Sequence, residues 1–182
     1  AASISVLDAV EQLVAQHTLL VFRIAYSVLR NHADAEDAAQ ECFLRVLKNS
    51  KRLGDVRSPK TWLARVAWTT ALDKYRSRRA MLSLDSDTQE GVPLLDHLAG
   101  NAAAPDDQLA QRQMQAMLQV LIAGLPEDLR HTLELSTVQE LNSAEIAEVL
   151  GIPEGSVRTR LMRARNLLKE KLSSRLEANR NA

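Results

Sequence analysis

The sequence has few of the residues that define several common protein classes. Its 182 residues include one cysteine, six glycines, five prolines and 3% aromatic residues. The single Cys42 excludes an intrachain disulfide, and no cysteines and histidines have zinc-site spacing. No apolar run approaches the ~18–20 residues of a membrane span, and no signal-peptide pattern opens the sequence. We therefore expect a cytoplasmic protein that holds no metal ion or cofactor.

The sequence also has no net charge, since 23 basic residues balance 23 acidic ones. DNA-binding proteins are usually basic, so the total argues mildly against that class, but the charges are segregated along the chain. Residues 81–111 contain six acidic residues and no lysine or arginine, together with Gly91, Pro93, Gly100 and Pro105. We interpret residues 83–108 as a flexible acidic linker between domains at 1–82 and 109–182. A plain solvated tether explains it equally well.

Leucine and alanine are plentiful, and apolar residues recur at helical spacing through nearly all the rest of the chain. No strand pattern of any length interrupts them. The prediction is an all-α fold of two small helical domains, the second a helix-turn-helix domain. The expected helices lie at about 6–14, 18–30, 33–49, 58–79, from 109 onward, 126–138, 142–150 and 153–176.

The helix-turn-helix prediction depends on the last third of the sequence. Asn142 and Glu145 have capping-box spacing ahead of a short apolar helix, and Gly151 stands where such a helix commonly ends. The helix after the turn has six basic residues and one acidic residue between Arg158 and Lys171. An ordinary solvated face in a chain of zero net charge would mix the signs, so the pattern favours DNA binding.

The periodicity of this last helix separates a packing face from a reading face. Its apolar side carries Val157, Leu161, Ala164, Leu168 and Leu172. Recognition helices read the major groove near their N-terminus, where arginine can pair with guanine through two hydrogen bonds. At that end the opposite side carries Ser156, Thr159, Met162 and Arg163, flanked by Arg158 and Arg160.

Two helices of the first domain also have distinctive faces. On the helix at 33–49, Asp34, Asp37, Glu41, Arg45 and Lys48 lie opposite a core stripe, and three crowded carboxylates suit a basic partner protein better than plain solvent. Cys42 belongs to the stripe as a small buried hydrophobe. The helix at 58–79 has two apolar faces and a narrow exposed strip: Arg65, Thr69, Asp73 and Arg76, with Trp62 at its edge. Basic groups beside an aromatic suit melted DNA, although both tryptophans could be core residues.

These segments, in this order, resemble bacterial RNA polymerase sigma factors of the extracytoplasmic-function (ECF) group of the sigma-70 family. The segment from Asp34 to Arg45 is similar to that family's polymerase-binding helix. The segment from Thr61 to Ala67 resembles the start of its −10 element helix. The segment from Leu125 to Arg165 resembles its −35 helix-turn-helix domain.

The resemblance implies a role for each surface. The first domain would bind core RNA polymerase through Asp34, Asp37, Gln40, Glu41 and Arg45. It would hold the melted −10 strand of promoter DNA through Lys60, Trp62, Arg65, Thr69 and Arg76. The second domain would bind the −35 duplex through Ser156, Arg158, Thr159, Arg160, Met162 and Arg163. The resemblance also implies an anti-sigma factor as a partner, able to hold the protein at the membrane.

Two positions depart from the family pattern, which often has Phe where Pro59 stands and Asn where Thr69 stands. Both border the pocket for a flipped promoter base, so the −10 base preference stays open. Two other classes of protein also stay open. A helix-turn-helix repressor or activator would bind DNA as a dimer without polymerase. A nucleic-acid enzyme such as a recombinase would need a nucleophile or metal site, and no constellation in the sequence qualifies.

Overall fold

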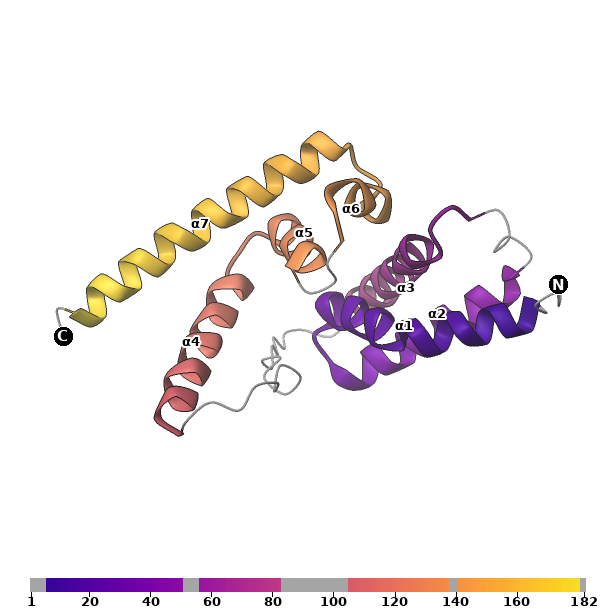
Figure 1. Ribbon diagram of the computed structural model, residues 1–182, viewed down its shortest axis with the longest axis horizontal. Coiled ribbons are helices and arrows are strands. Elements are labelled where there is room, and N and C mark those ends of the chain that lie inside the picture. Colours follow the sequence, from indigo (N-terminus) through magenta and orange to yellow (C-terminus); the bar gives the residue numbers. More distant parts are fainter. Residues whose placement is uncertain (1–5, 51–55, 83–104, 138–140, 181–182) are drawn as a thin grey trace.

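The computed structural model describes residues 6–50, 56–82, 105–137 and 141–180. Those residues form seven helices and no strand, which confirms the predicted all-α fold (Figure 1). The helices are α1 (Val6–Leu29), α2 (His32–Lys48), α3 (Pro59–Leu82), α4 (Pro105–Ala123), α5 (Glu127–Thr137), α6 (Ser143–Leu150) and α7 (Glu154–Arg180).

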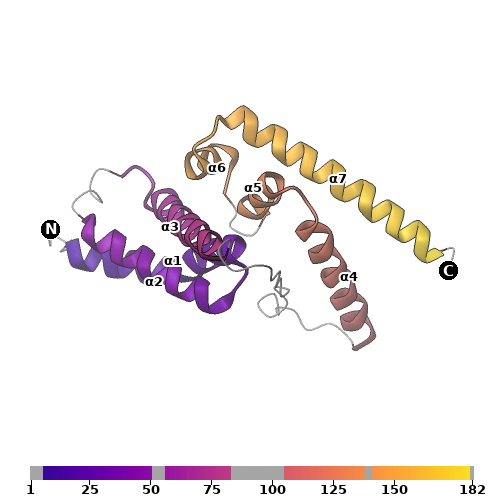
Figure 2. The same ribbon diagram turned by 180° about the vertical axis from the view of Figure 1, so that it is seen from behind.

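The first three helices pack on one another and enclose a common core (Figures 1 and 2). Helix α2 begins after Asn31, whose side chain accepts a hydrogen bond from the Asp34 backbone N–H, as expected of an N-cap. Ser58 does the same for Thr61 at the start of α3, over 3.3 Å. The core stripe predicted on α2 around Cys42 is buried, and its members are Ala35, Ala39, Cys42 and Val46.

The last four helices form a second group, in which α7 lies along α5, α6 and α4. Figure 1 shows α4 and the C-terminal half of α7 diverging from α5. Leu129 and Leu133 of α5, Ile146 of α6 and Val157 and Leu161 of α7 are all buried. The second domain is therefore held together where these three helices meet.

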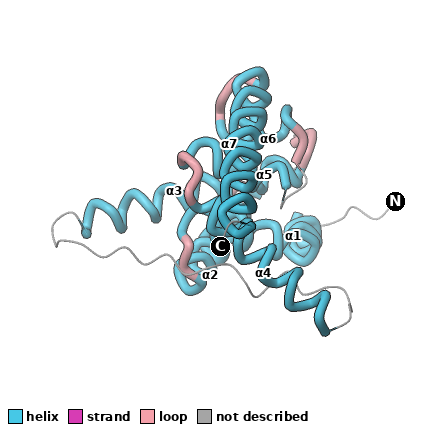
Figure 3. The backbone as a smooth tube through the Cα atoms, turned by 90° about the vertical axis from the view of Figure 1, so that its left-hand side faces the viewer, coloured by secondary structure: helices cyan, strands magenta, loops and turns pink. Residues whose placement is uncertain are grey.

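The two groups of helices are in contact with each other, through α3 with α6 and α1 with α5. Helix α3 is consequently buried on two sides, as its sequence predicts: Leu63 and Thr70 are fully buried, and Trp68 is 6% exposed. Its C-terminal end projects beyond the other helices (Figure 3), and every residue from Arg76 to Leu82 is exposed.

Three helix boundaries differ from the expectation by four residues or more. Residues 6–29 form one helix instead of two, because no glycine or proline interrupts them and Thr18 Oγ1 donates to the Val14 carbonyl within the helix over 2.6 Å. Helix α4 begins at Pro105, a residue favoured at the first helical position, so 105–108 are not linker. The rest of the predicted linker lies outside the described residues. Helix α7 continues to Arg180, four residues beyond its expected end.

Burial makes Cys42 chemically inert. The residue is 0% exposed, and burial raises the pKa of its thiol to about 12. Because the thiolate is the nucleophile, we expect native protein at pH 8 to react with a thiol reagent only as fast as it unfolds, whereas protein in denaturant should react at once. Stopped-flow labelling measures both rates. Fast labelling of the native protein would contradict this assignment of Cys42 to the core.

Candidate functional site

The predicted helix-turn-helix is formed by α6, a tight turn and α7. The Asn142 side chain accepts a hydrogen bond from the Glu145 N–H over 3.0 Å, and the Glu145 carboxylate accepts one from the Asn142 N–H over 2.9 Å. These two bonds are the predicted capping box. Gly151 ends α6 with φ of 67°, a left-handed conformation that favours glycine. The turn then leads directly from α6 into the N-terminal end of α7.

The reading face of α7 is largely open. Thr159, Met162 and Arg163 are exposed, and Met162 keeps 56% of its surface accessible although its side chain is apolar. Ser156 is half-buried. Val157, Leu161 and Ala164 hold the opposite side of the helix in the core. The predicted separation of packing and reading faces is therefore present.

The two flanking arginines differ in their surroundings. Arg158 is exposed and forms an ion pair with Glu154, one turn earlier, over 2.5 Å. Arg160 is half-buried, and its Nε lies 3.5 Å from a carboxylate oxygen of Asp128 on α5. Arg160 therefore also helps to hold α7 against α5, a role that the helical wheel did not show.

The predicted DNA strip on α3 is also exposed in most of its length. Arg65, Thr69 and Arg76 face solvent, whereas Lys60 and Trp62 are half-buried. Thr69 Oγ1 lies 3.0 Å from the backbone carbonyls of Arg65 and Val66. The Thr69 hydroxyl proton therefore has a partner within the helix, although the residue itself is exposed.

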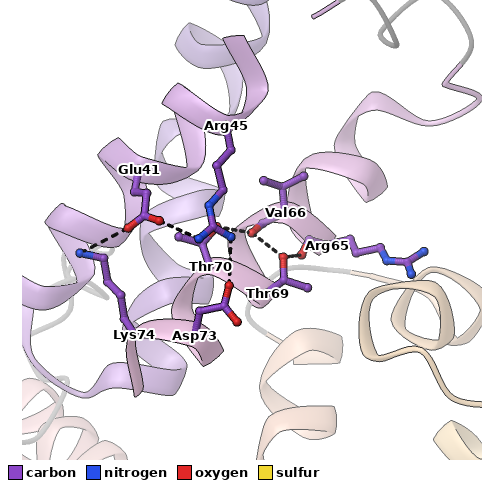
Figure 4. Close-up of polar contacts among 8 residues, drawn as sticks. All are labelled: Glu41, Arg45, Arg65, Val66, Thr69, Thr70, Asp73 and Lys74. Atoms are coloured by element: carbon purple, nitrogen blue, oxygen red, sulfur yellow. Dashed lines mark hydrogen bonds and ion pairs between the residues drawn. The ribbon is translucent and has the colours of Figure 1, made fainter. Parts of the chain in front are cut away.

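Helices α2 and α3 are joined by a network of ion pairs, drawn in Figure 4. The centre of the network is Arg45, which lies 2.7 Å from Glu41 and 3.1 Å from Asp73. Lys74 approaches the second carboxylate oxygen of Glu41 to 3.7 Å. Burial lowers the pKa of Arg45, but the bonds to Asp73 and Glu41 outweigh it and raise that pKa above its usual value. Arg45 is thus a fixed cation between two helices.

Some of the predicted polymerase-binding residues are paired with α3, and others are not. The sequence predicts the Glu41–Arg45 pair, because these residues are one helical turn apart. It does not predict the partners on α3, which are 28 or more positions away and lie on a different helix. Asp34 is likewise paired with Arg78 of α3. Asp37 and Gln40 remain exposed, and they form no ion pair or hydrogen bond with any described residue in the structure. These two side chains are the most available to a partner.

Two exposed leucines of α2 were missed from the sequence. Leu44 is 57% and Leu47 is 42% exposed, and Leu44 follows Gln40 by one helical turn. Apolar side chains beside open polar groups are typical of a protein interface. The sequence could have shown them, because Leu44 and Leu47 are apolar residues that lie outside the core stripe of this helix.

Neither a metal centre nor a membrane span is found among the described residues. No three histidine, cysteine or acidic side chains there are grouped closely enough to hold a metal ion. No helix in the same ranges is long and apolar enough to cross a membrane.

Comparison with known families identifies both halves of the chain. Residues 13–81 match the sigma-70 region 2 family model, and residues 115–168 match the sigma-70 region 4 model. The first match contains α2 and most of α3, and the second contains the helix-turn-helix. Together they define a sigma-70-type protein.

Similar proteins narrow the family further. The ECF RNA polymerase sigma factor SigW of Bacillus subtilis is 31% identical over 154 residues, covering 84% of this chain and 82% of SigW. The RNA polymerase sigma-H factor of Pseudomonas aeruginosa is 31% identical over 166 residues, with 86% and 81% covered. The chain belongs to the ECF group of RNA polymerase sigma factors.

A solved structure has the same fold. The sigma factor RpoE of Bartonella quintana, crystallised with the anti-sigma factor NepR, matches with a TM-score of 0.72 and 18% identity. The match covers 90% of this chain and 96% of RpoE. The two-part helical architecture is therefore that of a known sigma factor.

Proposed function

We propose that this protein is an alternative sigma factor that binds core RNA polymerase, directs it to promoters and takes part in −10 melting, without catalytic activity of its own. The observation that carries the proposal is the exposure of three different surfaces on a sigma-factor fold. They are the Asp37–Gln40 side of α2, the basic strip of α3 and the N-terminal reading face of α7. A conventional regulator would need the third surface alone.

Each surface receives the role that the family resemblance implies. Asp37, Gln40 and Glu41 bind polymerase, with Leu44 as an apolar neighbour, and Asp34 and Arg45 keep α2 fixed against α3. Trp62, Arg65 and Arg76 hold melted −10 DNA by base stacking and phosphate neutralisation. Arg158, Thr159, Met162 and Arg163 bind the −35 duplex. The protein acts in the bacterial cytoplasm, where its polymerase partner works.

An anti-sigma factor is the second protein partner that we propose. Support comes from two similar sigma factors of known structure. RpoE was solved with the anti-sigma factor NepR, and CnrH was solved with the cytosolic domain of CnrY. CnrH is 24% identical to this chain, with a TM-score of 0.58, and covers 91% of it.

The free protein should bind promoter duplex weakly. Its charge is balanced, and α7 offers only one short basic face, so few phosphates can be neutralised without polymerase. We expect a Kd at physiological salt in the range of non-specific binding, about 10⁻⁴ to 10⁻⁶ M, and much tighter binding once core polymerase is added. Fluorescence anisotropy with a labelled promoter duplex measures both. Tight, sequence-specific binding by the free protein would favour the conventional regulator.

A further inference from the structure

The strip of α3 that is assigned to melted DNA contains one residue of the opposite charge. Asp73 follows Thr69 by one helical turn and precedes Arg76 by three residues, so it lies on the same face of the helix. Its side chain is 57% exposed. A carboxylate at this place repels the phosphates that Arg65 and Arg76 would bind. The DNA-binding role of the strip therefore requires that this charge be neutralised.

The charge that neutralises Asp73 comes from α2. Arg45 Nη1 lies 3.1 Å from Asp73 Oδ2, and among the described residues Arg45 is the only cation paired with this carboxylate. The guanidinium is also held through its other terminal nitrogen, because Nη2 donates to Glu41 Oε1 over 2.7 Å. Figure 4 shows the guanidinium between the two carboxylates. Arg45 is thus fixed at the edge of the DNA strip although it belongs to another helix.

Lys74 does not replace Arg45 in this role. It is next to Asp73 in the sequence, but a helix turns by about 100° per residue, so the two side chains leave α3 in different directions. Lys74 instead approaches Glu41 Oε2 to 3.7 Å. In Figure 4 its ammonium group lies on the opposite side of Glu41 from Arg45. The two cations therefore flank Glu41, and only Arg45 reaches Asp73.

The Arg45–Asp73 pair has a larger effect on charge than on stability. The two side chains are 37% and 57% exposed, and ion pairs as open as this contribute little to stability. An unpaired carboxylate, by contrast, acts on phosphates over a Debye length of about 8–10 Å at physiological salt. Thr69 and Arg76 are separated from Asp73 by only about 5–6 Å along the helix axis. The charge of Asp73 therefore affects the whole centre of the strip.

We propose that Arg45 is a positioning residue for melted −10 DNA: by neutralising Asp73, it allows the basic side chains of the strip to bind phosphates. The proposal rests on the proposed function, because it deepens the role of the same strip. It assigns Arg45 to the DNA surface, whereas the family resemblance places it among the polymerase-binding residues. Removal of the Arg45 charge should weaken DNA binding, and removal of the Asp73 charge should strengthen it.

The test is a series of charge variants at this pair in the full-length protein. Arg45→Gln lowers the net charge by one, Asp73→Asn raises it by one, and the double variant leaves it at zero. Transcript yield from a promoter fragment library is measured at rising salt with saturating core polymerase, and affinity for core polymerase is measured separately. We expect Arg45→Gln to lower the yield at least about threefold, Asp73→Asn to raise it, and the double variant to return to the parent yield.

This order of yields distinguishes neutralisation from a structural role. Both single variants break the same ion pair, so a pair that only joined α2 to α3 would be lost equally, and both yields would fall together. Salt dependence is the second readout. Each phosphate contact on a single strand changes the slope of log affinity against log salt by about 0.7. We expect a shallower slope for Arg45→Gln and a steeper slope for Asp73→Asn.

The matched controls are Glu11→Gln on α1 and Arg112→Gln on α4, where exposed side chains make the same charge changes on other helices. Neither control should change the yield or the slope. The proposal is wrong if the yield of Asp73→Asn falls with that of Arg45→Gln, if the double variant is not restored, or if the controls reproduce the effects. It is also wrong if Arg45→Gln loses only affinity for core polymerase.

A second assay separates this proposal from the proposed function. The same variants, without polymerase, are titrated against a labelled thymidine oligonucleotide of about 16 nucleotides, because base stacking tolerates any sequence. If the parent protein gives no promoter-dependent transcription, the proposed function fails and this series decides the role of the pair. Affinity that is highest for Asp73→Asn, equal for the parent and the double variant and lowest for Arg45→Gln supports the proposal. Any other order, or no binding at low salt, overturns it.

Discussion

Replacing Asp37 and Glu41 with arginine is expected to abolish binding to core RNA polymerase and, with it, all transcription that depends on this protein. The change reverses two negative charges on the open side of α2, where a basic partner surface would then meet like charges. Asp37 is exposed and Glu41 is half-buried in the Arg45 network. A pull-down with core polymerase measures the loss directly.

The structure shows how to separate this effect from a loss of stability. Glu41→Arg breaks the pairs with Arg45 and Lys74, and partly exposed pairs of this kind contribute about 0.2–1 kcal/mol each. Asp37→Arg alone breaks no pair with a described residue and should leave the thermal midpoint unchanged. Glu11→Arg with Glu177→Arg makes the same total charge change on other helices and is the matched control. Full polymerase binding by the double variant would refute the docking assignment.

Replacing Arg163 with alanine is expected to remove a base preference in the −35 element. Arg163 is exposed on the third turn of α7, on the same open face as Met162. An arginine paired with a base edge contributes about 1–3 kcal/mol of discrimination, so its loss should relax the preference at one position by roughly 5- to 150-fold. Transcription from a promoter library randomised across the −35 element, with core polymerase present, measures each preference.

The flanking arginines provide contrasting controls. Arg158→Ala should weaken a preference less than Arg163→Ala, because Arg158 lies at the edge of the reading face and pairs with Glu154. Arg160→Ala should reduce transcription from every promoter sequence alike. Because Arg160 also contacts Asp128, the thermal midpoint of this variant must be measured as well. If Arg163→Ala leaves every base preference as it was, the reading face has been placed on the wrong side of α7.

The sequence predicts burial and helix ends correctly where they depend on neighbouring residues of one helix. The buried stripe through Cys42, the capping box of Asn142 and the glycine end of α6 all depend on residues within a few positions of one another. So does the exposed strip of α3, which a helical wheel resolves. These features were predicted correctly because 3.6-residue periodicity and capping are local physics.

The sequence predicts poorly wherever a residue's partner comes from another helix. No residue close to Arg45 in the sequence indicates that its partner is Asp73 of α3. In the same way, no residue close to Arg30 indicates that its partner is Glu134 in the second domain. The two-sided burial of α3 was predicted, but the second side belongs to α5 and α6 rather than to the first domain. Charge signs can suggest that pairs exist, whereas only the tertiary arrangement selects the partners.

The central claim is that this chain makes core polymerase initiate at specific promoters. The direct measurement is in vitro transcription with purified core polymerase, with and without the protein, on a fragment library whose transcript 5′ ends are sequenced. We predict discrete start sites only when the protein is present, sharing two conserved elements upstream, and their loss with Asp37→Arg and Glu41→Arg. Start sites that do not change when the protein is added, or repression at a palindromic site, would contradict the claim.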